Sequence, residues 1–165
     1  MDKPLLTGRK KYHQGKYRPQ NPSKYIGNVD NIMYRSSWEH ILFKFLDSNP
    51  AVVKWASEEL VLLYVSPIDG NQHRYFLDAL AMVRQQDGTI KKFIIEVKPS
   101  KETRVPVPSK TKSMERLQEE IRTYSINQAK WKVAKEYAIK TGSEFLILTE
   151  NELLQKPVRK RRGSK

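Results

Sequence analysis

An apolar run near the middle of the chain carries two opposite charges, and it constrains the fold more than any other stretch. The sequence of residues 93–99 is Phe-Ile-Ile-Glu-Val-Lys-Pro, a β-branched pattern typical of a buried strand. Because side chains alternate between the two faces of a strand, Glu96 and Lys98 share one face with Ile94. A buried charge is costly unless it is paired or binds an ion. The pattern therefore indicates either a functional site or a structural ion pair at the end of a strand.

The preceding apolar segment supplies a second carboxylate. Residues 73–83 are apolar on both faces, which predicts a central strand covered on both sides. Alternation places Tyr75, Leu77, Ala79, Ala81 and Val83 on one face, and Phe76, Asp78, Leu80 and Met82 on the other. Asp87-Gly88 then predicts a hairpin turn. With a suitable register, this antiparallel hairpin would place Asp78 beside Glu96 and Lys98.

Two carboxylates and a lysine are a suitable set for phosphodiester chemistry. Paired carboxylate oxygens suit Mg²⁺, with water and phosphate oxygens completing its coordination shell. Such a metal polarises the phosphate, and a lysine orients the attacking water or offsets developing charge. The three histidines are scattered, which gives little support for zinc, and the sequence contains no glycine-rich nucleotide-binding motif.

The net charge of +13 is concentrated at the two ends of the chain. Residues 1–29 hold seven basic residues and one acidic residue, and residues 156–165 hold six basic residues and no acidic one. Basic arms attract polyanions, so we expect contact with DNA; charge alone supports a solvated tail almost as well. Tyrosines at positions 12, 17 and 25 favour nucleic acid, because aromatic rings among cations stack on bases or sugars.

Further DNA contacts are predicted beside the charged strand. Residues 100–112 form a long loop with several prolines and basic residues, and a loop of this kind next to a site is often functional. On the helix that follows, Lys132 could contact DNA, but a solvated position for its side chain is at least as well supported. The candidate DNA-binding residues are Lys10, Lys11, Arg18, Lys101, Arg104, Lys110, Lys132, Arg159, Lys160, Arg161 and Arg162.

Periodicity predicts a single α/β domain with a mixed four-stranded sheet flanked by helices. Residues 60–65, 73–83 and 93–97 are expected to form an antiparallel meander. A helix over residues 114–142, interrupted around residues 125–127, would allow a right-handed crossover to a parallel last strand at residues 144–149. The predicted organisation is a basic extended arm at 1–33, a domain at 34–150 and a basic tail at 151–165.

Ser36 to Glu39 match a capping box at the start of a helix that Asn49-Pro50 ends. The Glu39 carboxylate therefore has two competing roles, as a cap partner or as an acid near a metal, and the pattern alone favours the cap. Glu58 is a weaker acidic candidate, for which a structural role is favoured. No apolar run approaches the roughly 18 residues of a membrane span, and we expect neither secretion nor membrane association. The absence of cysteine excludes disulfides and thiolate metal sites.

Several segments together resemble a known nuclease family. A helical Glu39, then Asp78, then Glu96 and Lys98 on successive elements resembles the PD-(D/E)XK nuclease superfamily. Longer segments of the sequence are similar to the head-completion nucleases of T-even bacteriophages, over roughly residues 20–150. They are more distantly similar to the N-terminal catalytic domain of the endonuclease subunit of Tn7-type transposases. Leu77 stands where the motif usually has proline, which removes no catalytic group. The segments are Tyr34 to Glu39, Arg74 to Asp78, Glu96 to Pro99, Asn127 with Lys130-Trp131-Lys132, and Phe145 to Glu150.

The resemblance implies a PD-(D/E)XK, restriction-endonuclease-like core and a Mg²⁺-dependent (or Mn²⁺-dependent) DNA endonuclease that leaves 5′-phosphate and 3′-hydroxyl ends. It assigns metal ligation to Asp78, Glu96 and the Val97 carbonyl. Lys98 would be the water-orienting base or electrostatic stabiliser, and Glu39 an accessory acid.

The resemblance also implies a place in phage assembly. The protein would process double-stranded DNA after packaging and ready the filled head for tail attachment, with portal or neck proteins as partners, in the virion and in the host cytoplasm during assembly. Two alternatives remain open: a non-catalytic, DNA-binding structural head protein on a nuclease-like fold, and a transposase-type or repair endonuclease. The pattern leaves the oligomeric state open.

Overall fold

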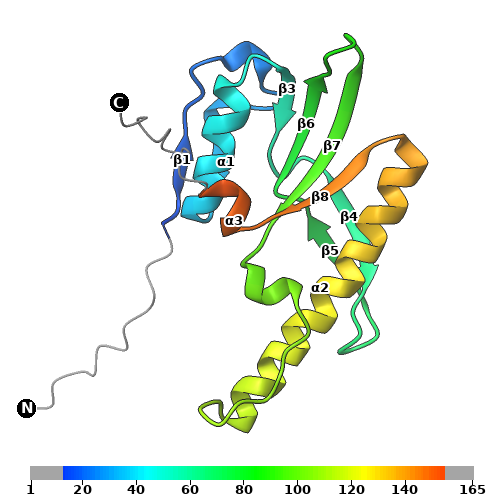
Figure 1. The fold of residues 1–165 in the computed structure, drawn as a ribbon. Coiled ribbons are helices and arrows are strands. Elements are labelled where there is room, and N and C mark those ends of the chain that lie inside the picture. Colours follow the sequence, from blue (N-terminus) through cyan, green and yellow to red (C-terminus); the bar gives the residue numbers. More distant parts are fainter. Residues whose placement is uncertain (1–12, 155–165) are drawn as a thin grey trace, which may run out of the picture.

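A four-stranded mixed sheet forms the centre of the protein in the computed structural model, which describes residues 13–154 (Figure 1). Its strands are β3 (Val52–Ala56), β6 (Ala79–Arg84), β7 (Ile90–Val97) and β8 (Glu144–Leu148). The order is β3-β6-β7-β8, with antiparallel pairing between the first three strands and parallel pairing of β8 with β7. The mixed α/β class, the four-stranded sheet and the parallel last strand agree with the sequence prediction.

Helix α1 (Ser37–Ser48) covers one face of this sheet. Ser36 caps the helix by accepting a hydrogen bond from the Glu39 N–H, as the capping-box pattern predicts. The apolar stripe of α1 packs against the side chains of Ile95 and Val97 from β7, on the face opposite Glu96. A short helix, α3 (Glu150–Leu153), contacts α1 (Figure 1).

Residues 15–34 pack onto the domain, so the prediction of an extended arm is wrong for this part of residues 1–33. The segment contains a small antiparallel pair and two short 3₁₀ turns: β1 (Gly15–Tyr17), η1 (Pro22–Lys24), η2 (Val29–Asn31) and β2 (Ile32–Tyr34). Tyr17 and Tyr25 are buried edge-on against Trp55, so these rings serve the core and not base stacking. Residues 1–12 and 155–165 lie outside the described part of the chain.

A buried carboxylate fixes this N-terminal segment to α1. Asp47 is 1% exposed and accepts hydrogen bonds from the Tyr17 hydroxyl and from the N–H groups of Gln20 and Asn21. Burial and the nearby Asp47 raise the pKa of Tyr17 to about 12. Because buried backbone donors need acceptors, Asp47 provides the hydrogen bonds that this segment would otherwise lack.

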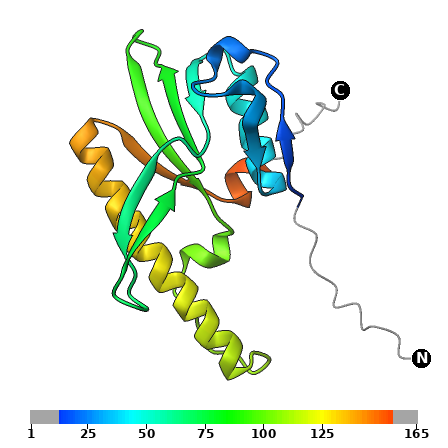
Figure 2. The same ribbon diagram turned by 180° about the vertical axis from the view of Figure 1, so that it is seen from behind.

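The opposite face of the sheet is covered by a long helix and a hairpin (Figure 2). Helix α2 (Met114–Thr141) is continuous, so the predicted interruption near residues 125–127 is wrong. It ends at Gly142, whose φ of 64° is left-handed and favours glycine. Trp131 and Ala134 of α2 share a core with Ile94 of β7. Within residues 13–154, no helix combines the length and hydropathy that crossing a membrane requires.

The hairpin consists of β4 (Val61–Val65) and β5 (Gln72–Phe76), which pair only with each other. The predicted meander therefore had the wrong first strand, since β3 takes that place beside β6. The predicted strand over residues 73–83 is divided at Leu77-Asp78. Tyr75 and Leu77 consequently pack with α2, whereas Ala79 and Ala81 face α1, and the predicted common face for these four residues is wrong.

Candidate active site

The β6–β7 ladder brings two carboxylates together at one end of the central sheet. Ala79 pairs with Ile95 at the end of this ladder, so Asp78, the residue before Ala79, lies beside Glu96, the residue after Ile95. The Asp78 Oδ2 atom accepts a hydrogen bond of 2.7 Å from the Val97 N–H, which ties the carboxylate to β7. Leu77, just before Asp78, donates its N–H to the Leu60 carbonyl of the hairpin. The division of the strand thus positions Asp78 between the sheet and the hairpin.

Glu96 is 2% exposed, and both of its carboxylate oxygens have partners. The Tyr75 hydroxyl donates to Oε2 at 3.0 Å, and the Lys98 ammonium lies 3.2 Å from Oε1. Glu96 and Lys98 therefore form the ion pair that was one of the two interpretations of the sequence. The pair lies beside a second, partly buried acid, Asp78, so it is not an isolated ion pair at a strand end.

Burial and neighbouring charges shift the pKa values of Asp78, Glu96 and Lys98. Burial, and then the nearby Glu96 carboxylate, raise the pKa of Asp78 well above its ordinary value. Burial also raises the pKa of Glu96, although Lys98 and the Tyr75 hydroxyl partly oppose the shift. Burial alone would lower the pKa of Lys98, but the two carboxylates outweigh it and raise that pKa. A buried and a half-buried carboxylate that lie side by side with raised pKa values form a pair that a divalent cation would stabilise.

The donor chemistry of the pair fits a hard cation such as Mg²⁺, which prefers oxygen ligands and keeps several waters. Among residues 13–154, no cluster of three or more His, Asp and Glu side chains is arranged to hold a metal. The described chain therefore offers the Asp78 and Glu96 carboxylates, and a bound cation would take its other ligands from elsewhere, such as water and phosphate oxygens.

Glu39 serves as a cap partner in the first turn of α1. Its Oε2 accepts a hydrogen bond of 2.9 Å from the Arg35 N–H, and its Oε1 accepts one of 3.1 Å from the Ser36 hydroxyl. The Glu39 charge also contributes to the raised pKa of Asp78, so Glu39 lies close to the carboxylate pair. Glu58 forms an ion pair with Arg35 at 2.6 Å, and its backbone has a left-handed φ of 53°.

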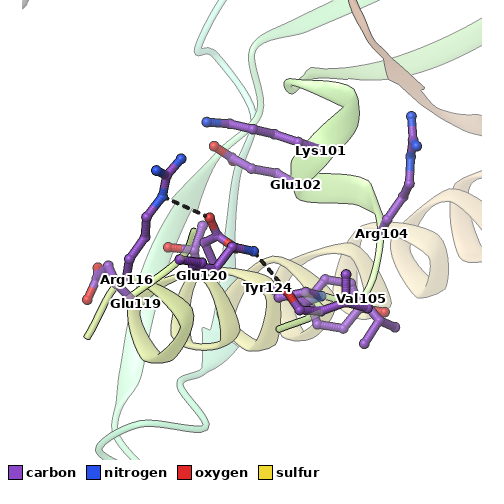
Figure 3. A pocket seen from close by; sticks show the side chains of 12 residues that line it. Lys101, Glu102, Arg104, Val105, Arg116, Glu119, Glu120 and Tyr124 are labelled. Carbon is purple, nitrogen blue, oxygen red and sulfur yellow. Dashed lines mark hydrogen bonds and ion pairs between the residues drawn. The ribbon is translucent and has the colours of Figure 1, made fainter. Parts of the chain in front are cut away.

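The predicted DNA-binding residues fall into separate regions. Lys101, on the short 3₁₀ helix η3 (Ser100–Thr103), and Arg104 line a pocket of about 490 Å³ between this segment and α2. Figure 3 shows Lys101 and Arg104 on one wall, and Arg116 paired with Glu120 on the other. Lys110 and Lys132 are exposed, and Arg18 lines a different hollow beside α1. Lys10, Lys11, Arg159, Lys160, Arg161 and Arg162 lie outside the described residues.

Sequence reasoning missed Lys130 as a residue of the site. Its ammonium lies 5.5 Å from the ring centre of Tyr64 and 5.4 Å from that of Tyr75. Lys130 is three residues after the buried Asn127 and four before the buried Ala134, so the helical stripe already places it on the inner face. Lys132, the predicted contact, lies on the exposed side.

Comparison with known proteins decides the family. Residues 49–150, which include Asp78, Glu96 and Lys98, match the family described as TnsA-like endonuclease N terminal. The chain belongs to this family. It is also 42% identical over 144 residues to the head completion nuclease of Enterobacteria phage T4, and the alignment covers 86% of this chain and 93% of that protein. The chain is thus a homologue of a phage head completion nuclease, as the resemblance predicted. The family implies a restriction-endonuclease-like fold, in agreement with the mixed sheet.

Proposed function

We propose that the protein is a Mg²⁺-dependent (or Mn²⁺-dependent) DNA endonuclease that processes the ends of packaged double-stranded DNA and readies the filled phage head for tail attachment. The observation that carries this proposal is the placement of Asp78 beside Glu96, with Lys98 next to them, in a chain of an endonuclease family. The same observation argues against a structural head protein with a degenerate site, because the acidic pair and the lysine are all present.

Asp78, Glu96 and the Val97 carbonyl would hold the metal. When bound, Mg²⁺ supplies a Lewis acid that polarises the phosphate. The Val97 N–H holds the Asp78 carboxylate in place, and the Tyr75 hydroxyl holds that of Glu96. Both carboxylates are therefore oriented by hydrogen bonds before any ligand arrives, which reduces the reorganisation needed on binding.

Lys98 would act as a hydrogen-bond donor. Without a metal, the neighbouring carboxylates raise the pKa of Lys98. A protonated lysine would orient the attacking water or stabilise negative charge that develops on a phosphate oxygen. Glu39 would add a third acid near Asp78, beyond its role as a helix cap.

DNA would approach along the segment that follows β7. Lys101 and Arg104 lie within six residues of Lys98, in the pocket between η3 and α2, where they would contact backbone phosphates. The basic sequences at 1–12 and 155–165 would add contacts that depend strongly on salt. The proposed domain spans residues 34–150 with the packed segment before it. Portal or neck proteins would be partners, in the virion and in the host cytoplasm during assembly.

The proposal is tested by incubating purified protein with linear duplex DNA and Mg²⁺ or Mn²⁺. Cleavage should leave 5′-phosphate and 3′-hydroxyl ends, and it should be lost in Asp78→Ala and Lys98→Ala while DNA binding stays within a few-fold of wild type. Cleavage that persists in both variants would overturn the site assignment.

A complementation assay separates the nuclease from a structural head protein. Phage carrying Asp78→Ala should fail to complete heads if hydrolysis is needed. Normal head completion by this variant, together with failure when the basic ends are deleted, would instead establish the structural role.

A further inference from the structure

Lys130 is a half-buried cation without an acidic partner. Within the described part of the chain, its ammonium makes no ion pair within 4.0 Å and donates no hydrogen bond. The half-buried Lys92 shares this property, whereas the half-buried lysines Lys24, Lys98 and Lys112 all have such partners. The rings of Tyr64 and Tyr75 contribute an attraction of about 0.5–2 kcal/mol to a nearby cation. This attraction uses none of the three N–H donors of the ammonium.

The position of Lys130 connects it to the carboxylate pair through Tyr75. The ring of Tyr75 lies under the Lys130 ammonium, and the hydroxyl of the same side chain donates to Glu96. Tyr75 is 2% exposed, so this connection is fixed by the core. The three N–H donors of Lys130 are therefore held beside the site by a residue that cannot easily move.

The charges of the site show what these free donors could bind. Lys98 is already paired with Glu96, and Lys130 brings the total of the two lysines and two carboxylates to zero. Glu39, whose charge also acts on Asp78, lowers this total to −1. A divalent cation would then leave a net charge of +1 to receive a phosphodiester of charge −1. Without Lys130, the net charge would be zero, and the remaining lysine would be paired with Glu96.

We propose that Lys130 binds a non-bridging oxygen of the DNA phosphate that enters the site, and that Tyr64 and Tyr75 hold its ammonium in position for this contact. The proposal rests on the proposed nuclease function for the identity of the anion. It adds to Asp78, Glu96 and Lys98 a residue that would touch the substrate from the long helix α2.

The test compares Lys130→Met, which removes the charge at nearly constant length, with Lys130→Arg, which keeps it. Lys135→Met is the matched control, because Lys135 is exposed on the same helix and makes no ion pair with a described residue. Binding of a duplex oligonucleotide is measured by fluorescence anisotropy at one fixed concentration of Ca²⁺, a hard divalent cation that also binds carboxylate oxygens, from 50 to 300 mM salt. One lost phosphate contact lowers the slope of log Kd against log salt by about 0.9.

We expect that lower slope in Lys130→Met, the wild-type slope in Lys130→Arg and Lys135→Met, and a kcat/KM for Mg²⁺-dependent cleavage at least tenfold lower in Lys130→Met. A wild-type slope and cleavage rate in Lys130→Met would overturn the proposal, because a purely structural lysine would change neither at equal folded fraction. If Lys130→Met does not fold, Lys130→Gln is judged by the same two readouts.

The salt dependence of DNA binding is measured without catalysis, so the Lys130 contact and the nuclease function can be refuted independently. A wild-type protein that never cleaves DNA, but loses one phosphate contact in Lys130→Met, would refute the nuclease and keep the contact. Cleavage by wild type, with no effect of Lys130→Met on binding or cleavage, would support the nuclease and refute the Lys130 contact.

Discussion

Replacing Tyr75 with phenylalanine tests how the core holds the acidic pair. The change removes the 3.0 Å hydrogen bond to Glu96 and leaves the ring, its burial and its contact with Lys130 in place. A hydrogen bond to a charged group contributes about 1.5–3 kcal/mol. In a chain of this size, 1 kcal/mol moves Tm by about 2–4 °C. We therefore expect Tyr75→Phe to lower the free energy of unfolding by about 1.5–3 kcal/mol and Tm by about 3–12 °C.

The matched control is Tyr64→Phe. Tyr64 lies on the neighbouring strand of the hairpin, is 8% exposed and also faces Lys130, but its hydroxyl donates no hydrogen bond to a described residue. We expect this variant to change stability by less than about 0.5 kcal/mol. Both are measured by urea denaturation at pH 8 in EDTA, with wild type alongside. Equal losses in the two variants, or no loss in Tyr75→Phe, would refute the reasoning that the Tyr75 hydroxyl stabilises a buried carboxylate.

Three further predictions address the acids. Because the folded-state pKa of Asp78 is raised, its ionisation destabilises the metal-free protein as pH rises through that pKa. Asp78→Asn should therefore have a higher Tm than wild type at pH 8 in EDTA, and this difference in Tm should disappear as pH falls toward 4. A difference that grows at low pH would contradict the prediction. Glu39→Gln keeps one acceptor oxygen for the Arg35 N–H, and its amide N–H can donate to the Ser36 hydroxyl, so stability should stay within about 0.5 kcal/mol. DNA cleavage should fall in this variant. Cleavage at the wild-type rate would show that Glu39 serves only as a cap partner. Asp47→Ala removes the acceptor of two N–H groups and a hydroxyl, and should cost more than about 3 kcal/mol in urea denaturation; a cost below about 1 kcal/mol would show that Asp47 does not fix the N-terminal segment.

Short-range patterns in the sequence predicted the local structure around the site. The alternation over residues 93–97 gave the correct faces of β7, since Ile94 and Glu96 face α2 while Ile95 and Val97 face α1. The Asp87-Gly88 turn gave the hairpin that places Asp78 beside Glu96. Both follow from the period of two in a strand and from the geometry of tight turns, which need no information about distant parts of the chain.

Long-range partners were less predictable. Alternation indicates which side chains share a face but not which strand lies alongside, so the separate β4–β5 hairpin and the division at Leu77-Asp78 were missed. The buried hydroxyls of Tyr17 and Tyr25 bond to Asp47 and Ser57, which lie 30 and 32 residues away along the chain, so a local sequence pattern could not predict their burial. Continuity of α2 through residues 125–127 reflects the burial of Asn127 and Trp131, because tertiary packing overrides weak helix propensity.

The central claim is that Asp78, Glu96 and Lys98 form a hydrolytic site for DNA. The most direct measurement is the rate at which wild type and Lys98→Ala convert supercoiled plasmid to nicked and linear forms, at DNA concentrations that saturate both proteins. We predict conversion by wild type that requires Mg²⁺ or Mn²⁺ and stops in EDTA, and a rate about 100-fold or more lower in Lys98→Ala. Equal rates in the two proteins, or conversion by wild type in EDTA, would contradict the account.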